Sequence, residues 1–172
     1  MAIREILTVP DPRLKLVSKP VDAVDDALRA LMDDMVETMY AADGIGLAAI
    51  QVGEPLRVIV MDLAGEGEEP QPRYFVNPVI LDPSDDTKPY EEGCLSIPGI
   101  TEDIKRPKVI KVVYQGINGV MQRNTYDDLW STCFQHELDH LNGKLFIDHL
   151  RPMKKILVKN KMKKTSKKEK KA

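Results

Sequence analysis

The chain has 172 residues, of which 42% are hydrophobic and 30% are charged, a composition typical of one globular domain and not of a disordered or fibrous protein. No apolar run approaches the roughly 18 residues that a membrane span requires, and the first residues contain no continuous apolar stretch, so we expect neither secretion nor membrane insertion. Its two cysteines are too few for a disulfide framework, so we expect reduced thiols and a cytoplasmic protein.

The net charge of −2 conceals an uneven distribution of charge along the chain. Residues 151–172 contain 11 of the 25 cations but only one of the 27 anions, so the net charge is +10 there and −12 over residues 1–150. A basic tail of this kind is typical of binding to nucleic acid or another polyanion. It is equally typical of a solvated, partly disordered terminus, and composition leaves both open.

The first half of the chain predicts an extended segment, a helix and then strands. Prolines interrupt residues 6–20, which predicts an extended arm. From Val24 to Tyr40 apolar residues recur at spacings of three and four, and Gly44 marks the end of the predicted helix. Strand patterns follow over residues 56–63, 74–81, 109–114 and 121–126, while residues 64–71 and 82–88 have the composition of surface loops.

Two more helices are predicted towards the carboxyl terminus. One starts after Asp127 or Asp128 as N-cap and runs to Asn142, with Gly143 as its stop. The other starts with Pro152 in its first turn. Its predicted apolar face consists of Met153, Ile156 and Leu157. The order helix, antiparallel strands, helix favours an α+β fold, and no second-domain boundary is visible.

The strongest chemical signal is His136-Glu137-Leu138-Asp139-His140, inside the predicted helix before Asn142. Positions i and i+4 share one helix face, so both imidazoles could bind one metal ion while Glu137 reaches a water beside it. The carboxylate could take a proton from that water and deliver it to a leaving group. Paired histidines also occur without a metal, but two of the three histidines in this chain form the motif. The third, His149, is expected to pack or to lie exposed.

A catalytic metal site of this kind generally has three protein ligands, so one is missing from the motif. Downstream, the sequence offers only three candidates: Asp148, His149 and Glu169. Upstream, Cys94 within Glu92-Gly93-Cys94-Leu95-Ser96 offers a thiolate, although taken alone it could be a small buried apolar residue. Cys133 lies on the same helix face as His136 and is expected to pack beneath the site.

A third segment, Gly-Ile-Gly-Leu-Ala-Ala-Ile-Gln over residues 44–51, follows the first predicted helix. Its glycines allow the backbone to approach a ligand closely, and the Gln51 amide could donate to a developing oxyanion. It does not match a dinucleotide fingerprint, because no strand leads into it and the third glycine is missing. By itself this segment is a weak signal.

Together the three segments resemble the peptide deformylase family, whose motifs occur in this order as G-I-G-L-A-A-I-Q at 44–51, E-G-C-L-S at 92–96 and Q-H-E-L-D-H at 135–140. The resemblance covers roughly residues 1–150. It implies an α+β fold in which antiparallel or mixed sheets pack around a central metal-binding helix, with a long N-terminal helix and a C-terminal helix. It also implies removal of the formyl group from N-formylmethionine of nascent polypeptides.

The resemblance further implies a role for individual residues. One divalent metal ion, ferrous iron in cells with zinc, nickel or cobalt also possible, would be held by Cys94, His136 and His140. The catalytic groups would be Glu137 as general acid and base, and the Gln51 side chain with the Leu95 backbone N–H as oxyanion donors. The substrate-binding residues would be Ile45, Gly46, Gly93, Leu129 and Cys133. Two places depart from the family pattern, namely residues 101–103, where many relatives carry an arginine, and Trp130-Ser131-Thr132.

The resemblance divides the chain into a catalytic domain at 1–150 and a basic, partly disordered C-terminal helix or tail at 151–172. Extended C-terminal helices dock bacterial deformylases on the ribosome, so rRNA is a candidate partner for this tail, whereas no membrane partner is expected. Two other functions stay open at this point. One is a metallopeptidase of the H-E-x-x-H type, and the other is a ribosome- or RNA-binding protein with a structural metal held by four protein ligands.

Overall fold

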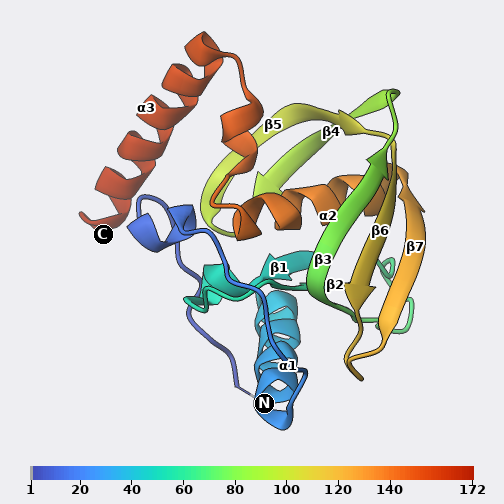
Figure 1. Ribbon diagram of the computed structural model, residues 1–172. Helices are drawn as coiled ribbons and strands as arrows, with labels where there is room; N and C mark the ends of the chain where they lie inside the picture. The colour runs from blue at the N-terminus through green and yellow to red at the C-terminus, as the bar shows by residue number, and fades with distance from the viewer. Residues whose placement is uncertain (1) are drawn as a thin grey trace.

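The computed structural model describes residues 2–172 and contains three α-helices, α1 (Asp26–Ala41), α2 (Asp128–Leu141) and α3 (Pro152–Glu169). Short 3₁₀ turns are η1 (Pro12–Lys15), η2 (Ala49–Val52) and η3 (Phe146–His149). The strands are β1 (Gly46–Ala48), β2 (Val58–Met61), β3 (Arg73–Pro83), β4 (Thr87–Cys94), β5 (Ile97–Pro107), β6 (Val109–Gln115) and β7 (Met121–Asp127). They form an antiparallel five-stranded sheet in the order β1-β2-β3-β6-β7 and a separate antiparallel ribbon of β4 and β5 (Figure 1).

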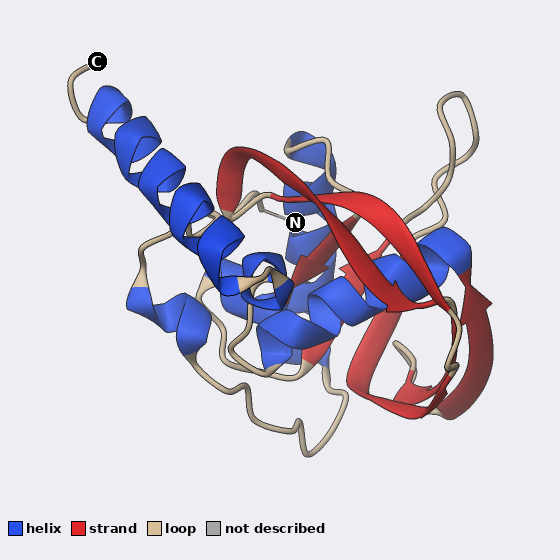
Figure 2. Ribbon diagram, turned by 90° about the horizontal axis from the view of Figure 1, so that it is seen from above, coloured by secondary structure: helices blue, strands red, loops and turns tan. Residues whose placement is uncertain are grey.

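Helix α2 lies between the two sheets and contacts strands of both (Figures 1 and 2). Helix α1 packs against β1 and β2 from the other side of the five-stranded sheet. Strand β2 is buried on both faces, and its side chains alternate between them: Val58 and Val60 join the α1 cluster, while Ile59 and Met61 join the α2 cluster. The α+β fold with a central helix, predicted from the family resemblance, is therefore confirmed.

The start of α1 follows from its sequence. The Asp25 side chain accepts a hydrogen bond from the Leu28 backbone N–H at 2.8 Å, which satisfies one of the unpaired donors of the first turn. The buried face then carries apolar residues at helical spacing, and the helix ends at Ala41, three residues before the predicted stop at Gly44.

The ribbon of β4 and β5 is the main difference from the sequence prediction. The loop predicted over residues 82–88 is shorter than expected and covers only residues 84–86, because β3 continues to Pro83 and β4 already begins at Thr87. Nothing in the sequence predicted either strand of the ribbon. Both are rich in charged residues, and the buried side chains Ile100 and Ile104 are too widely spaced to give a strict alternation. The extended arm at 6–20 is also interrupted, by the turn η1, which Asp11 caps.

Helix α3 projects from the body of the molecule (Figures 1 and 2). Its residues Met153, Ile156 and Leu157 share a face, as predicted, but that face points to solvent. Val158 and Met162 instead pack against a cluster built by β5 and η3. Among residues 2–172, no helix combines the length and apolar composition needed to cross a membrane.

Candidate metal centre

Three potential metal ligands from two distant segments converge beneath the ribbon. Cys94 ends β4, while His136 and His140 lie one turn apart on α2. One ligand atom from each lies within 4.8 Å of the others, and Cys94 Sγ is 3.3 Å from His140 Nε2. A register shift between Gly93 and Cys94 interrupts the β4–β5 pairing at this point, where the ribbon turns.

The charges of this cluster suit a metal cation. Burial would raise the pKa of the Cys94 thiol, but His140 and His136 outweigh it and lower the pKa to about 5, so that a thiolate is present at neutral pH. The Glu92 carboxylate lies 2.8 Å from His136 Nδ1, which leaves Nε2 of that ring for a ligand. A thiolate with two imidazoles is a donor set that fits borderline divalent metals such as iron, cobalt, nickel and zinc.

Glu137 lies next to His136 on α2 and beside the three potential ligands. The side chain is buried, its Oε2 has no hydrogen-bond partner among the described residues, and burial raises its pKa above the usual value despite the opposing effect of His136 and His140. A Cβ atom at Gly46 would lie 2.7 Å from Glu137 Oε1 and 3.0 Å from Cys133 Sγ. Glycine at position 46 therefore permits β1 to lie directly against the carboxylate.

Gln51 directs its amide nitrogen towards the cluster. Its Oε1 accepts a hydrogen bond from the Ala48 backbone N–H at 2.9 Å, so the NH₂ group must face the other way. That group donates to Ser96 Oγ at 3.0 Å and lies 3.6 Å from Cys94 Sγ. An N–H donor is thus positioned next to the potential metal ligands.

A cavity of about 510 Å³ opens over this cluster, a size suited to a small ligand or part of a peptide. Ten of the eleven predicted site residues line it: Ile45, Gly46, Gln51, Gly93, Cys94, Leu95, Leu129, Cys133, His136 and Glu137. His140 is buried and is not among the residues that line the cavity. Of the two segments that depart from the family pattern, Thr101 and Thr132 line the cavity, whereas Trp130 stacks on Tyr126 outside it.

The downstream ligand candidates do not join the cluster. Asp148 Oδ1 pairs with Lys155 at 2.7 Å, and His149 Nε2 lies 2.6 Å from Asp139 Oδ2. Glu169 is the last residue of α3 and is exposed. Within the described part of the chain, Cys94, His136 and His140 are the only group of three such residues arranged to hold a metal ion.

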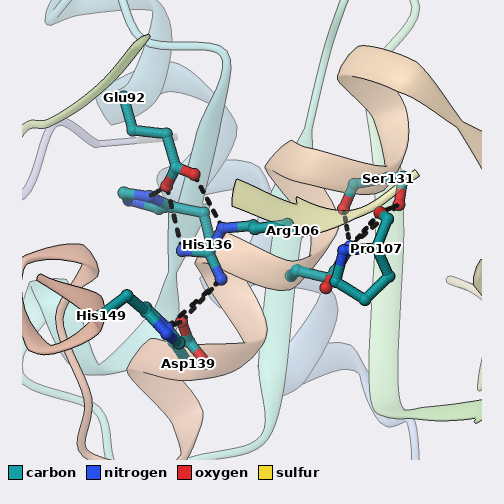
Figure 3. Close-up of polar contacts among 8 residues, drawn as sticks. Glu92, Arg106, Pro107, Ser131, His136, Asp139 and His149 are labelled. Carbon is teal, nitrogen blue, oxygen red and sulfur yellow. Dashed lines mark hydrogen bonds and ion pairs between the residues drawn. The ribbon is translucent and has the colours of Figure 1, made fainter. Parts of the chain in front are cut away.

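Sequence reasoning missed the polar network that supports the site (Figure 3). Arg106 is buried and forms two hydrogen bonds with Glu92, at 2.7 and 3.0 Å, and a third with Asp139 at 2.9 Å. Ser131 Oγ and Gln135 Nε2 both donate to the Pro107 carbonyl, at 2.8 and 3.0 Å, which ties α2 to the end of β5. The sequence pointed to this network only through Glu92, which belongs to the cysteine motif. Arg106 gave no signal, because it lies in β5, a strand that the sequence did not predict.

Comparisons with known proteins agree with this geometry. A family model described as polypeptide deformylase matches residues 3–156. The chain is 62% identical to a peptide deformylase of Maricaulis maris over 97% of this chain and 96% of that protein, and 62% identical to one of Phenylobacterium zucineum over 97% and 99%. A crystal structure of peptide deformylase from Ehrlichia chaffeensis superimposes with a TM-score of 0.91 at 40% identity, covering 98% of this chain and 99% of that one.

The three motifs, the α+β fold around α2 and the clustered cysteine and histidines thus coincide with a family model that spans most of the chain and with relatives that align over nearly their whole length. The chain belongs to the polypeptide deformylase family.

Proposed function

We propose that this chain removes the formyl group from N-formylmethionyl peptides within the cavity lined by Glu137 and Gln51. As a family member the chain is a metal-dependent amide hydrolase, and its substrates are the formylated amino termini of nascent polypeptides. The observation that carries the proposal is the convergence of Cys94 with the two α2 histidines next to a buried carboxylate, one oxygen of which has no hydrogen-bond partner in the described part of the chain.

Cys94, His136 and His140 would hold one divalent ion. When bound, the ion supplies Lewis-acid chemistry, which polarises a carbonyl group and lowers the pKa of water towards about 7. The donor set accommodates zinc, nickel and cobalt as well as iron, and the family resemblance favours ferrous iron in cells. The position left open by three protein ligands is what distinguishes a catalytic site from a structural one.

Glu137 performs the proton transfers. Its carboxylate lies at the base of the cavity, where one oxygen has no partner among the described residues and is free to accept a proton from water. Burial raises its pKa, which brings the group closer to the pH at which it can both accept and donate. The proton then passes to the amine that leaves when the C–N bond of the formamide breaks.

Gln51 and Leu95 stabilise the negative charge that develops on the formyl oxygen. The Gln51 amide is oriented in advance by Ala48 and Ser96, so no reorganisation is needed during the reaction. The backbone N–H of Leu95, in the turn between β4 and β5, would be the second donor.

The peptide would bind as an added strand. Among residues 2–172, strand β1 is an edge of the five-stranded sheet and β4 pairs only with β5, so both present unpaired backbone groups. Ile45 and Gly46 line one side of the cavity and Gly93 lines the other, which suits main-chain hydrogen bonds to an extended peptide. Ile45, Leu129 and Cys133 form an apolar pocket for the methionine side chain.

The test is formate release from a formyl-Met-Ala peptide by protein loaded with iron under anaerobic conditions. Glu137→Gln should keep about one metal ion per chain yet lose roughly 10²- to 10⁴-fold in kcat, the usual size of a general acid and base contribution. Asp103→Asn, which removes an exposed carboxylate outside the cavity, is the matched control and should retain full activity. Near-normal turnover by Glu137→Gln would contradict this role, and cleavage of unformylated peptides would favour a peptidase.

We further propose that α3 binds rRNA phosphates and so brings the active site near emerging chains. This helix carries most of the +10 charge of residues 151–172, its lysines are largely exposed, and the remainder of the chain is acidic. Charge complementarity with a polyanion supports the interaction. Truncation after Leu150 would be a poor test, because it removes Val158 from a buried cluster.

A triple variant that removes three positive charges from α3 is the better test. Changing Lys164, Lys167 and Lys168 to Gln should weaken co-sedimentation with ribosomes at low salt and flatten its dependence on salt, by roughly 0.7 to 0.9 in the log–log slope for each phosphate that the helix no longer neutralises. Activity on a short formyl peptide should be unchanged. The control changes three exposed lysines of the body: Lys19, Lys105 and Lys144. Equal losses in both triple variants would contradict docking through α3.

A further inference from the structure

A continuous chain of polar contacts links the potential metal ligand His136 to the half-exposed side chain of His149 (Figure 3). From His136 Nδ1 it passes to Glu92 at 2.8 Å, and from Glu92 to Arg106 at 2.7 and 3.0 Å. Arg106 Nη1 donates to Asp139 Oδ2 at 2.9 Å, and the same oxygen lies 2.6 Å from His149 Nε2. The chain connects four elements: α2, β4, β5 and η3.

The chain runs from the interior to the surface. The side chains of Glu92 and Arg106 are 5% and 4% exposed, that of Asp139 is 18% exposed, and that of His149 is 39% exposed. Arg106 therefore depends on its two carboxylate partners, because a buried guanidinium without them would carry a large desolvation cost. One of those partners, Asp139, is partly exposed, so solvent water can compete with Arg106 for its carboxylate.

His149 contacts this partly exposed carboxylate. A carboxylate oxygen only accepts hydrogen bonds, so His149 Nε2 carries the hydrogen and donates it to Asp139. The bond holds Asp139 Oδ2 in the position at which it also accepts from Arg106. Asp139 stands between His136 and His140 in the sequence of α2, and its link to His136 runs through Arg106 and Glu92.

A purely structural role for His149 in anchoring η3 is not needed. Phe146 and Ile147 of the same turn are buried in a cluster with β5. Asp148 accepts a hydrogen bond from the Leu145 backbone N–H at 2.9 Å and pairs with Lys155 of α3. The turn is therefore held by apolar packing and by a second carboxylate, without His149.

We propose that His149 is a positioning residue for the metal centre, acting through Asp139, Arg106 and Glu92 on the orientation of His136. This inference rests on the proposed metal site. Groups that orient a metal-binding histidine are worth about 10- to 100-fold in metal affinity or activity when they contact it directly. His149 acts through three intervening side chains, so the expected effect lies at or below the lower end of that range.

The experiment compares how fast the cobalt-loaded protein loses its metal to an excess of chelator. His149→Ala should release cobalt several-fold to about 10-fold faster than the unchanged protein, the lower end for an outer partner of a metal ligand. His149→Gln should restore slow release to within about twofold, because its amide nitrogen lies at a similar distance along the side chain and still donates to Asp139. Lys155→Ala, which breaks the other polar anchor of η3, should behave like the unchanged protein.

Two further readouts separate positioning from stability. The unfolding midpoint of the metal-free protein should be the same for His149→Ala and Lys155→Ala, and kcat of the fully loaded His149→Ala protein should fall more than its KM for formyl-Met-Ala rises. Unchanged cobalt release from His149→Ala, or equally fast release from Lys155→Ala, would overturn the inference. Failure of the unchanged protein to bind cobalt or release formate would instead refute the proposed function.

Discussion

At the scale of single residues, the two cysteines show how strongly position determines chemistry. Cys94 lies beside two imidazoles, which lower its pKa to about 5 against the effect of burial. Cys133 is buried near Glu137. Burial is the main effect that raises the pKa of this thiol well above its usual value, and the negative charge of Glu137 raises it further. One thiol is therefore ready to bind a cation, while the other stays protonated and packs against Gly46.

This contrast gives a spectroscopic prediction. Cobalt-loaded protein should show a thiolate-to-cobalt charge-transfer band, since Cys94 is the thiolate within reach of the histidines. The band should disappear in Cys94→Ser and persist in Cys133→Ser, measured by near-ultraviolet absorption at equal cobalt content. Loss of the band only in Cys133→Ser would assign the third ligand to Cys133 and contradict the proposed site.

At the scale of secondary-structure elements, α2 is held on two sides. Phe134 is fully buried and meets Phe75 of β3 edge to face, with ring centroids 5.2 Å apart. On the other side, Ser131 and Gln135 donate to the Pro107 carbonyl at the end of β5. Packing and hydrogen bonds together fix the rotation of the helix about its axis, and with it the direction in which His136 points.

Phe134 provides the test of this element. Phe134→Ala should lower the free energy of unfolding by about 3 to 5 kcal/mol, the usual cost of deleting a buried aromatic side chain, and should weaken cobalt binding because α2 can shift. Phe134→Leu fills more of the space and should cost less in both respects. Urea unfolding of the metal-free proteins and cobalt titration are the measurements, and a cost below about 1 kcal/mol for Phe134→Ala would contradict the packing argument.

At the scale of the whole molecule, the stability of residues 1–150 depends in part on carboxylates whose charged form is stabilised by the fold. Asp62 joins the end of α1 to the loop after β2, accepting hydrogen bonds from the Tyr40 hydroxyl and from the backbone N–H groups of Ala64 and Gln71. Burial would raise the pKa of Asp62, but these hydrogen bonds outweigh it and lower the pKa below the usual value. Its contribution to stability is therefore present above the unfolded-state pKa of about 4 and is lost as the pH falls through the native value.

The corresponding prediction compares Asp62→Asn with the unchanged protein across pH. At pH 7 the variant should be less stable by about 1 to 3 kcal/mol, since a charged hydrogen-bond acceptor is replaced by a neutral one. Below about pH 4 the difference should shrink, because the unchanged protein loses the same charge. Comparing the two proteins at each pH cancels the metal loss that both undergo in acid. A difference that stays constant from pH 7 to about pH 3 would contradict this role for Asp62.

The sequence by itself determined those features that depend on local spacing. The apolar period of α1 and the i, i+4 histidines of α2 are visible without any tertiary information, because helix geometry relates residues that are close in sequence. Strands β2, β3 and β6 were also predictable, since they are rich in β-branched or aromatic residues, and β7 was predictable from the glycine-containing turn at residues 116–119 that precedes it. The family motifs added the expectation that Cys94 joins the histidines.

Only the tertiary structure decided the features that depend on long-range pairing. The ribbon of β4 and β5 carries too many charges to show a strand pattern, and without it neither the partners of Arg106 nor the link from Glu92 to His149 could be placed. The outward orientation of the apolar residues of α3 also depends on which face of that helix meets β5, and a helical pattern alone does not specify this. Local periodicity defines the faces of an element, whereas the contacts between elements decide which face is buried.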